Sequence, residues 1–237
     1  MSEKIIRYIL SWVVVIAIVL VVRATFVEAV VIPSGSMEST LLVGDALLVN
    51  RFIYGVKIPV PFSNQQIPLI PGRGPQVGEI IAFASPIENR YVVKRCVALS
   101  GDTVEVVDKV LYVNGKAIKE PYVQHTDKRY FRGIMVDPAV YQQKWEEGEL
   151  ADWMGLQVRD NFGPVVVPED CIFAMGDNRD TSFDSRFWGP LHKKYLKGLP
   201  LFIFFSFDPG QEGENLFDLI QVWRWKAIRF LRIGRVM

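Results

Sequence analysis

This chain has few cysteines, few histidines and almost no net charge. It has two Cys and two His among 237 residues, and 27 Lys and Arg stand against 26 Asp and Glu. Two cysteines exclude a disulfide scaffold, and two Cys with two His are too few soft ligands for a four-coordinate zinc site without carboxylates. The His-Glu-x-x-His pattern of zinc hydrolases is absent from the sequence. We therefore expect no metal and no other cofactor.

The near-zero net charge also argues against nucleic acid as a partner, since a broad nucleic-acid-binding surface needs a clear basic excess. Hydrophobic residues make up 50% of the chain and charged residues 22%, which is typical of a globular protein and excludes a disordered, collagen-like or coiled-coil chain. The length fits one domain of about 200 residues with an appendage, or two small domains.

The appendage is an apolar N-terminal run. Tyr8–Val22 carries no charge and is flanked by Arg7 and Arg23. As a helix, this run covers only about 22 Å, but extension over residues 5–24 reaches about 30 Å, the thickness of the hydrocarbon core. A cleaved signal peptide is the alternative, but Val22-Arg23-Ala24 is a poor small-x-small cleavage site. The pattern predicts a single membrane anchor.

Basic residues are concentrated before this run, at Lys4 and Arg7, and only Arg23 follows it directly. The positive-inside rule then places the N-terminus in the cytoplasm. The predicted organisation is a cytoplasmic N-terminus at residues 1–7, a transmembrane helix with its core at residues 8–23, and an extracytoplasmic domain at residues 24–237.

The extracytoplasmic part reads as mostly β. Short apolar or alternating runs are separated by Gly, Pro, Asn and Asp, and Asn114-Gly115 is the sharpest hairpin signal. Two stretches, Pro59–Gly78 and Gln124–Gly163, look irregular, and residues of about 114–164 are predicted to form a small inserted subdomain. The basic tail Leu216–Met237 fits either an amphipathic membrane-surface helix or a closing strand. The expected strands are Ala46–Val49, Glu79–Phe83, Tyr91–Leu99, Thr103–Val107, Val110–Val113, Val165–Val167, Cys171–Met175 and Pro200–Phe207.

Three segments carry groups suited to catalysis. The first is Ser34-Gly35-Ser36, a turn that offers one hydroxyl for attack and a second as a hydrogen-bond donor, although such turns are common. The second is the run Tyr91–Ala98, in which a period of two places Lys94 on one strand face with Val92, Cys96 and Ala98. Desolvation on an apolar face lowers the pKa of an amine, so Lys94 is a candidate base; an edge-strand lysine that blocks aggregation is the alternative.

The third segment is Gly176–Arg186, which holds three Asp, two Arg and two Ser in eleven residues. Its composition fits either a loop knitted by ion pairs or the wall of a site. His125 and His192 stand in polar contexts and read as surface residues, so a Ser-His-Asp triad has little support. Cys96 and Cys171 lie in apolar runs, and we expect both to be free thiols.

Taken together and in this order, the motifs resemble those of bacterial type I signal peptidases. The resemblance covers the anchor and the whole catalytic domain, and four ordered motifs behind an N-terminal span are highly specific. The matching residues are Ser34-Gly35-Ser36-Met37 with Thr40-Leu41, Gly44-Asp45, Val93-Lys94-Arg95, Gly176-Asp177-Asn178-Arg179-Asp180, and Asp184-Ser185-Arg186.

The resemblance implies a membrane-bound serine endopeptidase with a Ser/Lys dyad on a signal-peptidase-like, β-rich catalytic domain. Ser36 matches the nucleophile, Lys94 the general base, and Ser182 the hydroxyl that orients the lysine. Ser34, with the backbone N–H of Ser36, matches the oxyanion hole. A supporting ion-pair group is matched by Arg95, Asp184 and Arg186, and we expect Arg95 to pair with Asp184.

The same resemblance implies a small apolar pocket beside the nucleophile, lined by Ile32, Pro33, Met37, Leu41 and Val93. Such a pocket selects small side chains, in accord with the small-x-small rule of signal-peptide cleavage. Residues 28–33 are extended in pattern and are expected to pair with the substrate as an added strand. The sequence departs from the family at Ser39 and Ser100, where Pro is usual, and neither change removes a catalytic group.

The expected function is therefore cleavage of signal peptides from secreted preproteins on the outer face of the cytoplasmic membrane, with preproteins and membrane lipid as partners. Three alternatives are weighed against it. A specialised relative that matures one or a few secreted proteins shares every motif. A catalytically inactive binding protein is disfavoured because Ser36, Lys94 and Ser182 are all present. A Ser/Lys self-cleaving regulator would carry a DNA-binding domain where this chain has its apolar run.

Overall fold

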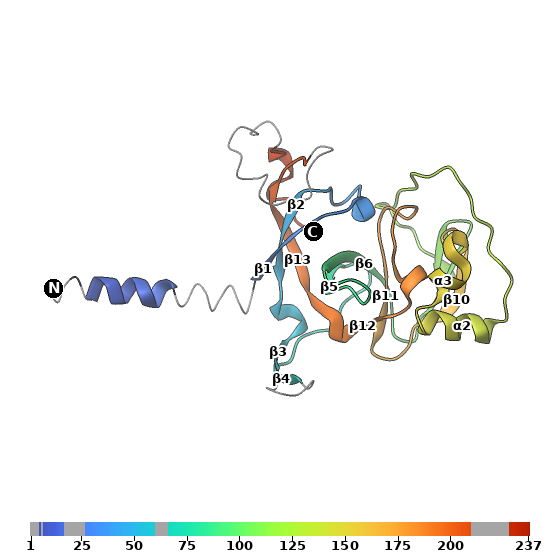
Figure 1. Ribbon diagram of the computed structural model, residues 1–237, viewed down its shortest axis with the longest axis horizontal. Coiled ribbons are helices and arrows are strands. Elements are labelled where there is room, and N and C mark those ends of the chain that lie inside the picture. The colour runs from blue at the N-terminus through green and yellow to red at the C-terminus, as the bar shows by residue number, and fades with distance from the viewer. Residues whose placement is uncertain (1–4, 6, 17–26, 60–65, 210–227) are drawn as a thin grey trace.

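The computed structural model describes residues 5, 7–16, 27–59, 66–209 and 228–237 of the protein (Figure 1). Residues 7–16 are helical. Within the described ranges, no helix has both the length and the apolar character that crossing a membrane requires. The predicted span at residues 8–23 is described only as far as Ile16, and its residues 17–23 lie outside the described part of the chain.

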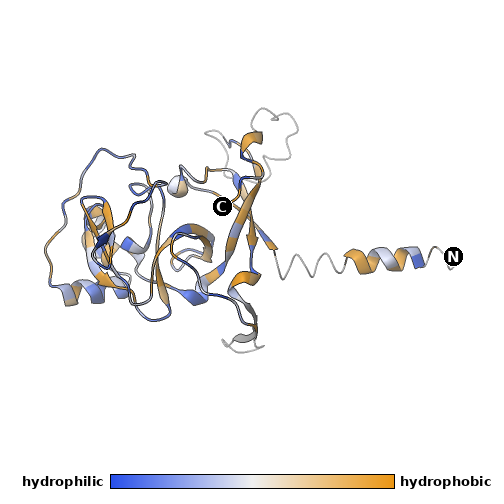
Figure 2. Ribbon diagram, turned by 180° about the vertical axis from the view of Figure 1, so that it is seen from behind, coloured by the Kyte–Doolittle hydropathy of each residue, from blue (hydrophilic) through white to orange (hydrophobic). Residues whose placement is uncertain are grey.

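The largest sheet has seven antiparallel strands, and the protein is mostly β, as predicted. Strands β6 and β11 have the predicted bounds, and most of their residues are buried. Figure 2 shows that the strands of this sheet are mainly hydrophobic. In spatial order the strands are β1 (Val27–Val31), β2 (Asp45–Asn50), β13 (Leu196–Ser206), β5 (Ile80–Ala84), β6 (Tyr91–Leu99), β11 (Cys171–Met175) and β12 (Leu191–His192).

Strand β13 joins the two halves of this sheet. Its first residues pair with β5, and from Leu199 onward it pairs with β2. Two bulges interrupt the β2 pairing, and the first lies at Pro200, where the missing N–H of proline is tolerated. At the change of partner stands Gly198, where a Cβ would lie 2.4 Å from the carbonyl oxygen of Asn50. The backbones approach so closely here that glycine is required.

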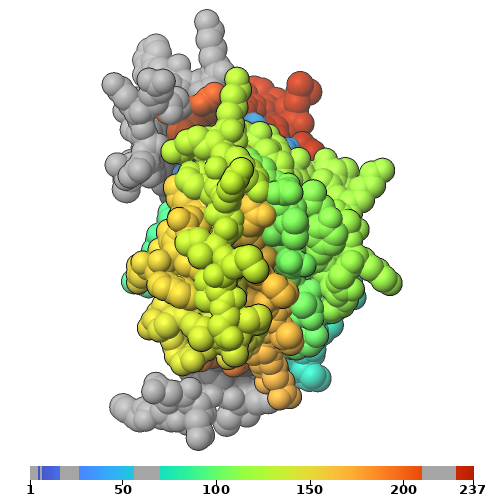
Figure 3. All heavy atoms as spheres, turned by 90° about the vertical axis from the view of Figure 1, so that its right-hand side faces the viewer, coloured from blue at the N-terminus to red at the C-terminus, as the bar shows by residue number. Residues whose placement is uncertain are grey.

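A second sheet and two helices lie at the right-hand end of the molecule in Figure 1, and Figure 3 shows the surface of this end. The rings of Trp145, Phe162 and Phe173 pack against one another between them, at centroid distances of 5.3 to 6.2 Å. Strand β10 lies at the end of the predicted insertion of about 114–164, and it pairs with β7, which precedes the insertion. The insertion therefore shares this sheet with earlier strands, and the boundaries of the insertion stay a prediction. The elements are β10 (Phe162–Val166), β7 (Thr103–Val107), β8 (Val110–Val113), β9 (Lys116–Ala117), α2 (Pro138–Glu146) and α3 (Leu150–Met154).

Both stretches that looked irregular contain regular structure. The hairpin of β3 (Val56–Pro59) and β4 (Gln66–Ile70) occupies part of the first, and α2 and α3 lie in the second. The start of α2 had a readable signal, because the Asp137 side chain accepts hydrogen bonds from the N–H groups of Ala139 and Val140, and Pro138 occupies the first helical turn. An Asp-Pro pair before a helix-compatible run predicts this helix start.

The C-terminal segment packs against the large sheet rather than forming a separate helix, as far as residues 228–237 show. Isolated bridges join Ile228 to Phe207 and Val236 to Phe202, on or directly after β13. Neither of the two structures considered for the basic tail, a surface α-helix or a closing strand, is seen in residues 228–237, which hold isolated bridges and a short 3₁₀ turn at Phe230–Arg232. Residues 216–227 of that tail lie outside the described ones.

Arg232 in this segment binds the fully buried carboxylate of Asp45 on β2. Its Nε lies 3.0 Å from Oδ1 and its Nη2 lies 2.5 Å from Oδ2, and Nη2 also donates to the carbonyl oxygen of Thr40 at 2.9 Å. Burial alone would raise the pKa of the Asp45 carboxyl, but the hydrogen bonds from Arg232, Ser206 and the Leu42 N–H hold that pKa below its usual value. The chain end is thereby tied to the turn that follows Ser36.

Replacing Arg232 by Met is expected to lower the free energy of unfolding by about 3 kcal/mol, because a buried carboxylate is left without its main partner. Urea unfolding followed by circular dichroism measures this loss. The matched control is Arg235→Met at an exposed position three residues further along, which should stay within about 0.5 kcal/mol of wild type. Equal stability of the two variants would contradict the prediction.

Candidate active site

Ser36 lies on a short 3₁₀ turn, Gly35–Met37, directly after β1. Ser34 precedes the turn in an extended conformation, and its Oγ lies 3.4 Å from the Oγ of Ser36. Met37 is only 1% exposed and anchors the turn in the hydrophobic core beneath it, whereas Ser36 is half-buried. The turn therefore presents two neighbouring hydroxyl groups from a fixed backbone.

The segment that follows β11 is hydrogen-bonded to this turn. The N–H of Asn178 donates to the carbonyl oxygen of Ser36 at 3.1 Å, and Asn178 Nδ2 donates to that of Gly35 at 3.4 Å. A Cβ at Gly176 would lie 2.3 Å from the Oγ of Ser182 and 2.4 Å from the Ser36 carbonyl oxygen. Only glycine lets the two segments come this close, so Gly176 sets the separation between the Ser36 turn and Ser182.

Ser39, where the family resemblance leads one to expect Pro, has a φ of 87°. Proline cannot adopt this conformation, because its ring locks φ near −65°. The Ser39 hydroxyl donates to the carbonyl oxygen of Tyr122 at 2.6 Å, which ties the turn to the segment that follows β9 of the second sheet. The departure at Ser39 therefore replaces a rigid residue by one that is held through a tertiary hydrogen bond.

Lys94 is buried in the middle of β6, with only 3% of its surface exposed. Its Nζ donates to the Oγ of Ser182 at 2.9 Å. Desolvation lowers the pKa of the amine to about 8. The negative charges of Asp184 and Asp177 oppose this lowering, whereas the positive charges of Arg186 and Arg90 add to it. A substantial fraction of Lys94 is thus neutral at pH values just above 7.

The strand periodicity places Lys94 largely as predicted. Val92 and Cys96 pack in one cluster with Ile81, which is the partner of Lys94 on β5, while Val93 packs in the cluster on the opposite face. Ala98 is the exception, since a bulge between β6 and β11 at Phe173/Ala174 shifts the register and Ala98 joins a different cluster. The apolar side chains that lie on the Lys94 face of β6 are therefore Val92 and Cys96, and Ala98 is not among them.

The expected pair of Arg95 with Asp184 is wrong. Arg95 instead binds Asp177, with Nε–Oδ1 at 2.8 Å and Nη2–Oδ2 at 2.5 Å, because it leaves β6 on the face opposite Lys94. Its guanidinium also lies 3.7 Å above the ring of Tyr122. Asp177 further accepts from the hydroxyl of Thr40 at 2.6 Å, so this pair braces the Ser36 turn.

Asp184 binds Arg186 at 2.8 Å, and both side chains are almost wholly buried. Burial alone would raise the pKa of the Asp184 carboxyl, but Arg186 and, further off, Lys94 and the Ser182 hydroxyl hold it below its usual range. Asp184 also caps the one-turn helix α4 (Ser185–Trp188) by accepting from the Arg186 N–H. The carboxylate is therefore charged and supplies negative potential beside Ser182.

Ser36 and Lys94 face one cavity of about 180 Å³. Four of the five predicted pocket residues line it, namely Ile32, Pro33, Met37 and Val93. Leu41 does not, because its side chain is fully buried in the cluster beneath the turn. Sequence reasoning missed the opposite wall, which includes Phe83, Ser85, Ile87, Glu88, Arg90, Tyr91, Val92, Thr181, Phe183 and Trp188.

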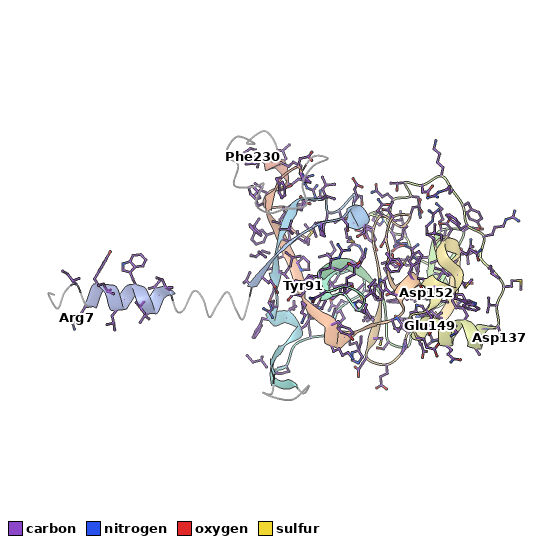
Figure 4. All side chains as sticks on the ribbon, viewed as in Figure 1. Arg7, Tyr91, Asp137, Glu149, Asp152 and Phe230 are labelled. Atoms are coloured by element: carbon purple, nitrogen blue, oxygen red, sulfur yellow. The ribbon has the colours of Figure 1, made fainter. Side chains whose placement is uncertain are left out.

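The cavity is lined by Tyr91–Lys94 of β6 and by Ile32 and Pro33, which follow β1. Among the described strands β1 pairs only with β2, which leaves its other edge open. On β6, the pairing with β11 covers Arg95–Leu99, so the edge from Tyr91 (labelled in Figure 4) to Lys94 is open on that side as well. The arrangement offers backbone N–H and C=O groups to an extended peptide that enters between them.

The histidines and cysteines lie elsewhere. His125 Nδ1 lies 3.0 Å from Asp180, His192 Nδ1 accepts from the Lys194 N–H, and neither ring lines the cavity. Cys96 and Cys171 are buried and are not joined to each other, as expected. Among the described residues, no group of three or more His, Cys, Asp and Glu side chains is placed to hold a metal ion.

Comparison with known proteins gives consistent similarities. Residues 5–205 match the family described as signal peptidase, peptidase S26. The chain is 40% identical over 190 residues to a signal peptidase I of Pseudomonas aeruginosa, covering 78% of this chain and 64% of the relative. It is 34% identical over 241 residues to a signal peptidase I of Helicobacter pylori, covering 83% of this chain and 81% of the relative. A solved signal peptidase I of Enterococcus faecalis matches with 30% identity and a TM-score of 0.38, over 54% of this chain and 97% of that one.

Replacing Lys94 by Met is expected to stabilise the protein below pH 8. The lysine pKa falls from 10.5 in the unfolded chain to about 8 in the folded one, so the folded state binds fewer protons between these pH values and wild-type stability rises with pH across that window. Below pH 8 the full desolvation cost, about 3 kcal/mol, is present, and Met avoids it.

Urea unfolding of Lys94→Met and wild type at several pH values from 6 to 10.5 measures the difference. The gain should be largest below pH 8 and shrink toward zero near pH 10.5. Lys116→Met on exposed β9 is the control and should show no comparable gain. A gain for Lys94→Met that did not change with pH would refute this account.

Proposed function

Because the chain belongs to the signal peptidase family, peptidase S26, we propose that it is a membrane-bound serine endopeptidase that removes N-terminal signal peptides from secreted preproteins. One observation carries the proposal beyond family membership: a buried lysine with a pKa of about 8 faces the same cavity as an accessible serine on a braced turn. This combination supplies a base and a nucleophile that function near neutral pH.

In the proposed reaction the neutral amine of Lys94 takes the proton of the Ser36 hydroxyl as its oxygen attacks the substrate carbonyl. Lys94 then gives this proton to the leaving amine, and the acyl group stays on Ser36 until water, deprotonated by the same amine, hydrolyses the ester. Ser182 holds the amine through its 2.9 Å hydrogen bond. The Nζ of Lys94 donates to Ser182, and the Oγ of Ser36 lies 3.4 Å from that of Ser34. The proposed reaction requires the Ser36 hydroxyl to come within hydrogen-bond distance of the amine.

Ser34 and the backbone N–H of Ser36 are the proposed donors to the negatively charged oxygen of the intermediate. The 3.4 Å separation of the two serine hydroxyls supports this role, since a carbonyl attacked by Ser36 lies within reach of Ser34. Each donor of this kind contributes a few kcal/mol to lowering the barrier. Arg95, Asp184 and Arg186 act indirectly, because they hold the Ser36 turn and the Ser182 segment in place.

Selectivity for small residues before the scissile bond follows from the apolar wall of Ile32, Pro33, Met37 and Val93. We propose that the substrate enters as an extended strand between the open edges of β1 and β6. An added strand aligns every second side chain with this wall, which accounts for a small-x-small preference. Leu41 contributes only by supporting Met37 from below.

The proposed location is the outer face of the cytoplasmic membrane, with residues 8–23 as a single anchor and the N-terminus in the cytoplasm. The apolar run and the distribution of basic residues support this topology. Membrane lipid and secreted preproteins are the proposed partners. A role limited to one or a few preproteins is compatible with the same site, and the set of proteins left uncleaved in a depleted cell distinguishes the two.

The pH dependence of cleavage tests the mechanism directly. With a base whose pKa is about 8, kcat/KM should rise about tenfold per pH unit below pH 8 and level off above it. Lys94→Arg, Lys94→Met and Ser36→Ala should each reduce kcat/KM by at least about 1,000-fold, since none leaves a working base and nucleophile. Ser182→Ala should reduce it less, because it removes an orienting group.

His125→Ala and His192→Ala are the controls, and both should retain the wild-type profile. Thermal unfolding of every variant separates loss of catalysis from loss of fold. Activity in the Lys94→Arg variant, or dependence on either histidine, would exclude a Ser/Lys mechanism.

Deletion of residues 1–23 tests the role of the anchor. Cleavage of a soluble signal peptide in detergent should persist, because the catalytic groups all follow Ala24. Cleavage of a membrane-inserted preprotein should fall further, since the anchor raises the local concentration of enzyme rather than supplying chemistry. A well-folded truncated protein with no activity on either substrate would contradict this division.

A further inference from the structure

One wall of the cavity has no part in the selection of small residues. It is aromatic and consists of Phe83, Phe183 and Trp188. The rings of Phe83 and Trp188 lie 6.0 Å apart at an angle of 53°. This aromatic wall is large and apolar, so it has no evident use for the small side chains that precede a signal-peptide cleavage site.

The aromatic wall lies on the Lys94 side of β6. Phe83 pairs with Val92 across the β5–β6 ladder, and its ring packs in the same cluster as Val92 and Trp188. Val93, the strand residue of the small pocket, packs on the opposite face. The small pocket and the aromatic wall are therefore separated by the thickness of one strand, with Lys94 on the aromatic side.

Phe183 is the exposed member of this wall and is held in place. Its side chain is 48% exposed, yet its ring stacks on buried Phe187 at 5.0 Å and 27°. Trp188 Nε1 donates to its carbonyl oxygen at 3.3 Å. Phe183 therefore presents a fixed apolar surface to the cavity that Lys94 and Ser36 line.

The path of the proton indicates what binds there. Lys94 must protonate the nitrogen of the leaving group, so the first residue of the mature protein has to lie next to Nζ. Nζ is bonded to Ser182, and the chain neighbours of Ser182 that line the cavity are Thr181 and Phe183. The residue before the scissile bond occupies the Val93 side, so the first mature residue meets Phe183.

A second cavity of about 310 Å³ is lined in part by the same residues. It shares Thr181 and Phe183 with the first cavity and also includes Leu156 and Phe187. Phe183 therefore lines both cavities.

We propose that Phe183, with Phe83 and Trp188, forms a subsite for the side chain of the first mature residue and favours an apolar side chain there. The proposal rests on the proposed peptidase function. It assigns a second level of selectivity to this protein, on the far side of the scissile bond from the small-residue pocket.

The test uses the full-length protein in detergent and signal-peptide substrates that differ only in the first mature residue, Ala or Leu. Mass spectrometry confirms the cleaved bond, and kcat/KM is measured for each peptide. Phe183→Ala should lower the ratio of kcat/KM for Leu over Ala by about tenfold, the discrimination that a few buried methylene groups supply. Phe183→Leu should lower it less, because part of the apolar surface is kept.

Phe230→Ala removes a phenylalanine of the C-terminal segment that is 63% exposed, against 48% for Phe183, and should keep the wild-type ratio (Figure 4). A loss of rate in Phe183→Ala that is equal for both peptides would overturn the subsite and indicate that Phe183 only supports Ser182. Selectivity that changes with the residue two positions before the scissile bond, in a parallel pair of peptides, would also overturn it. A wild-type protein that cleaves no peptide would refute the peptidase function itself, and the subsite with it.

Discussion

An amine buried among apolar side chains is the constraint on which the rest of the site depends. Lys94 has lost nearly all contact with water, and this desolvation is the main cause of its lowered pKa. The nearby cations have carboxylates of their own, Asp184 for Arg186 and Asp177 for Arg95. These ion pairs keep the local charge nearly balanced. Unpaired carboxylates would raise the pKa of Lys94 and unpaired arginines would lower it further, and the pairing limits both effects.

The site is assembled from three segments that are far apart in the sequence. The Ser36 turn follows β1, Lys94 lies on β6, and residues 176–188 connect β11 to β12. This third segment touches both of the others, through Asn178 to the Ser36 carbonyl and through Ser182 to Lys94. The C-terminal segment adds a further brace, since Arg232 reaches the carbonyl oxygen of Thr40. A turn with little regular structure is thus fixed by hydrogen bonds that come from the whole length of the domain.

Local patterns predicted much of the fold and part of the site. Alternation located β6, β7, β8 and β11 to the residue, because each strand has one or both faces in a core and its polar punctuation is clear. The same alternation placed Lys94 on an apolar face. Prediction failed where the tertiary structure selects the partner of a side chain. Residues 176–186 hold three aspartates that could pair with Arg95, and only the packing of β11 against β6 brings Asp177, rather than Asp184, to its side.

By itself the sequence determined the mostly β class and the positions of the principal strands, because these follow from periods of two residues. It offered Ser36 and Lys94 only as candidates, and the resemblance of the ordered motifs to signal peptidases supplied the roles of nucleophile and base proposed for them. Only the tertiary structure decided the depth at which Lys94 is buried, the partner of each arginine, the withdrawal of Leu41 into the core and the aromatic wall around Phe183. These properties arise from contacts between segments far apart in the chain, and desolvation and ion pairing depend on such contacts rather than on local sequence.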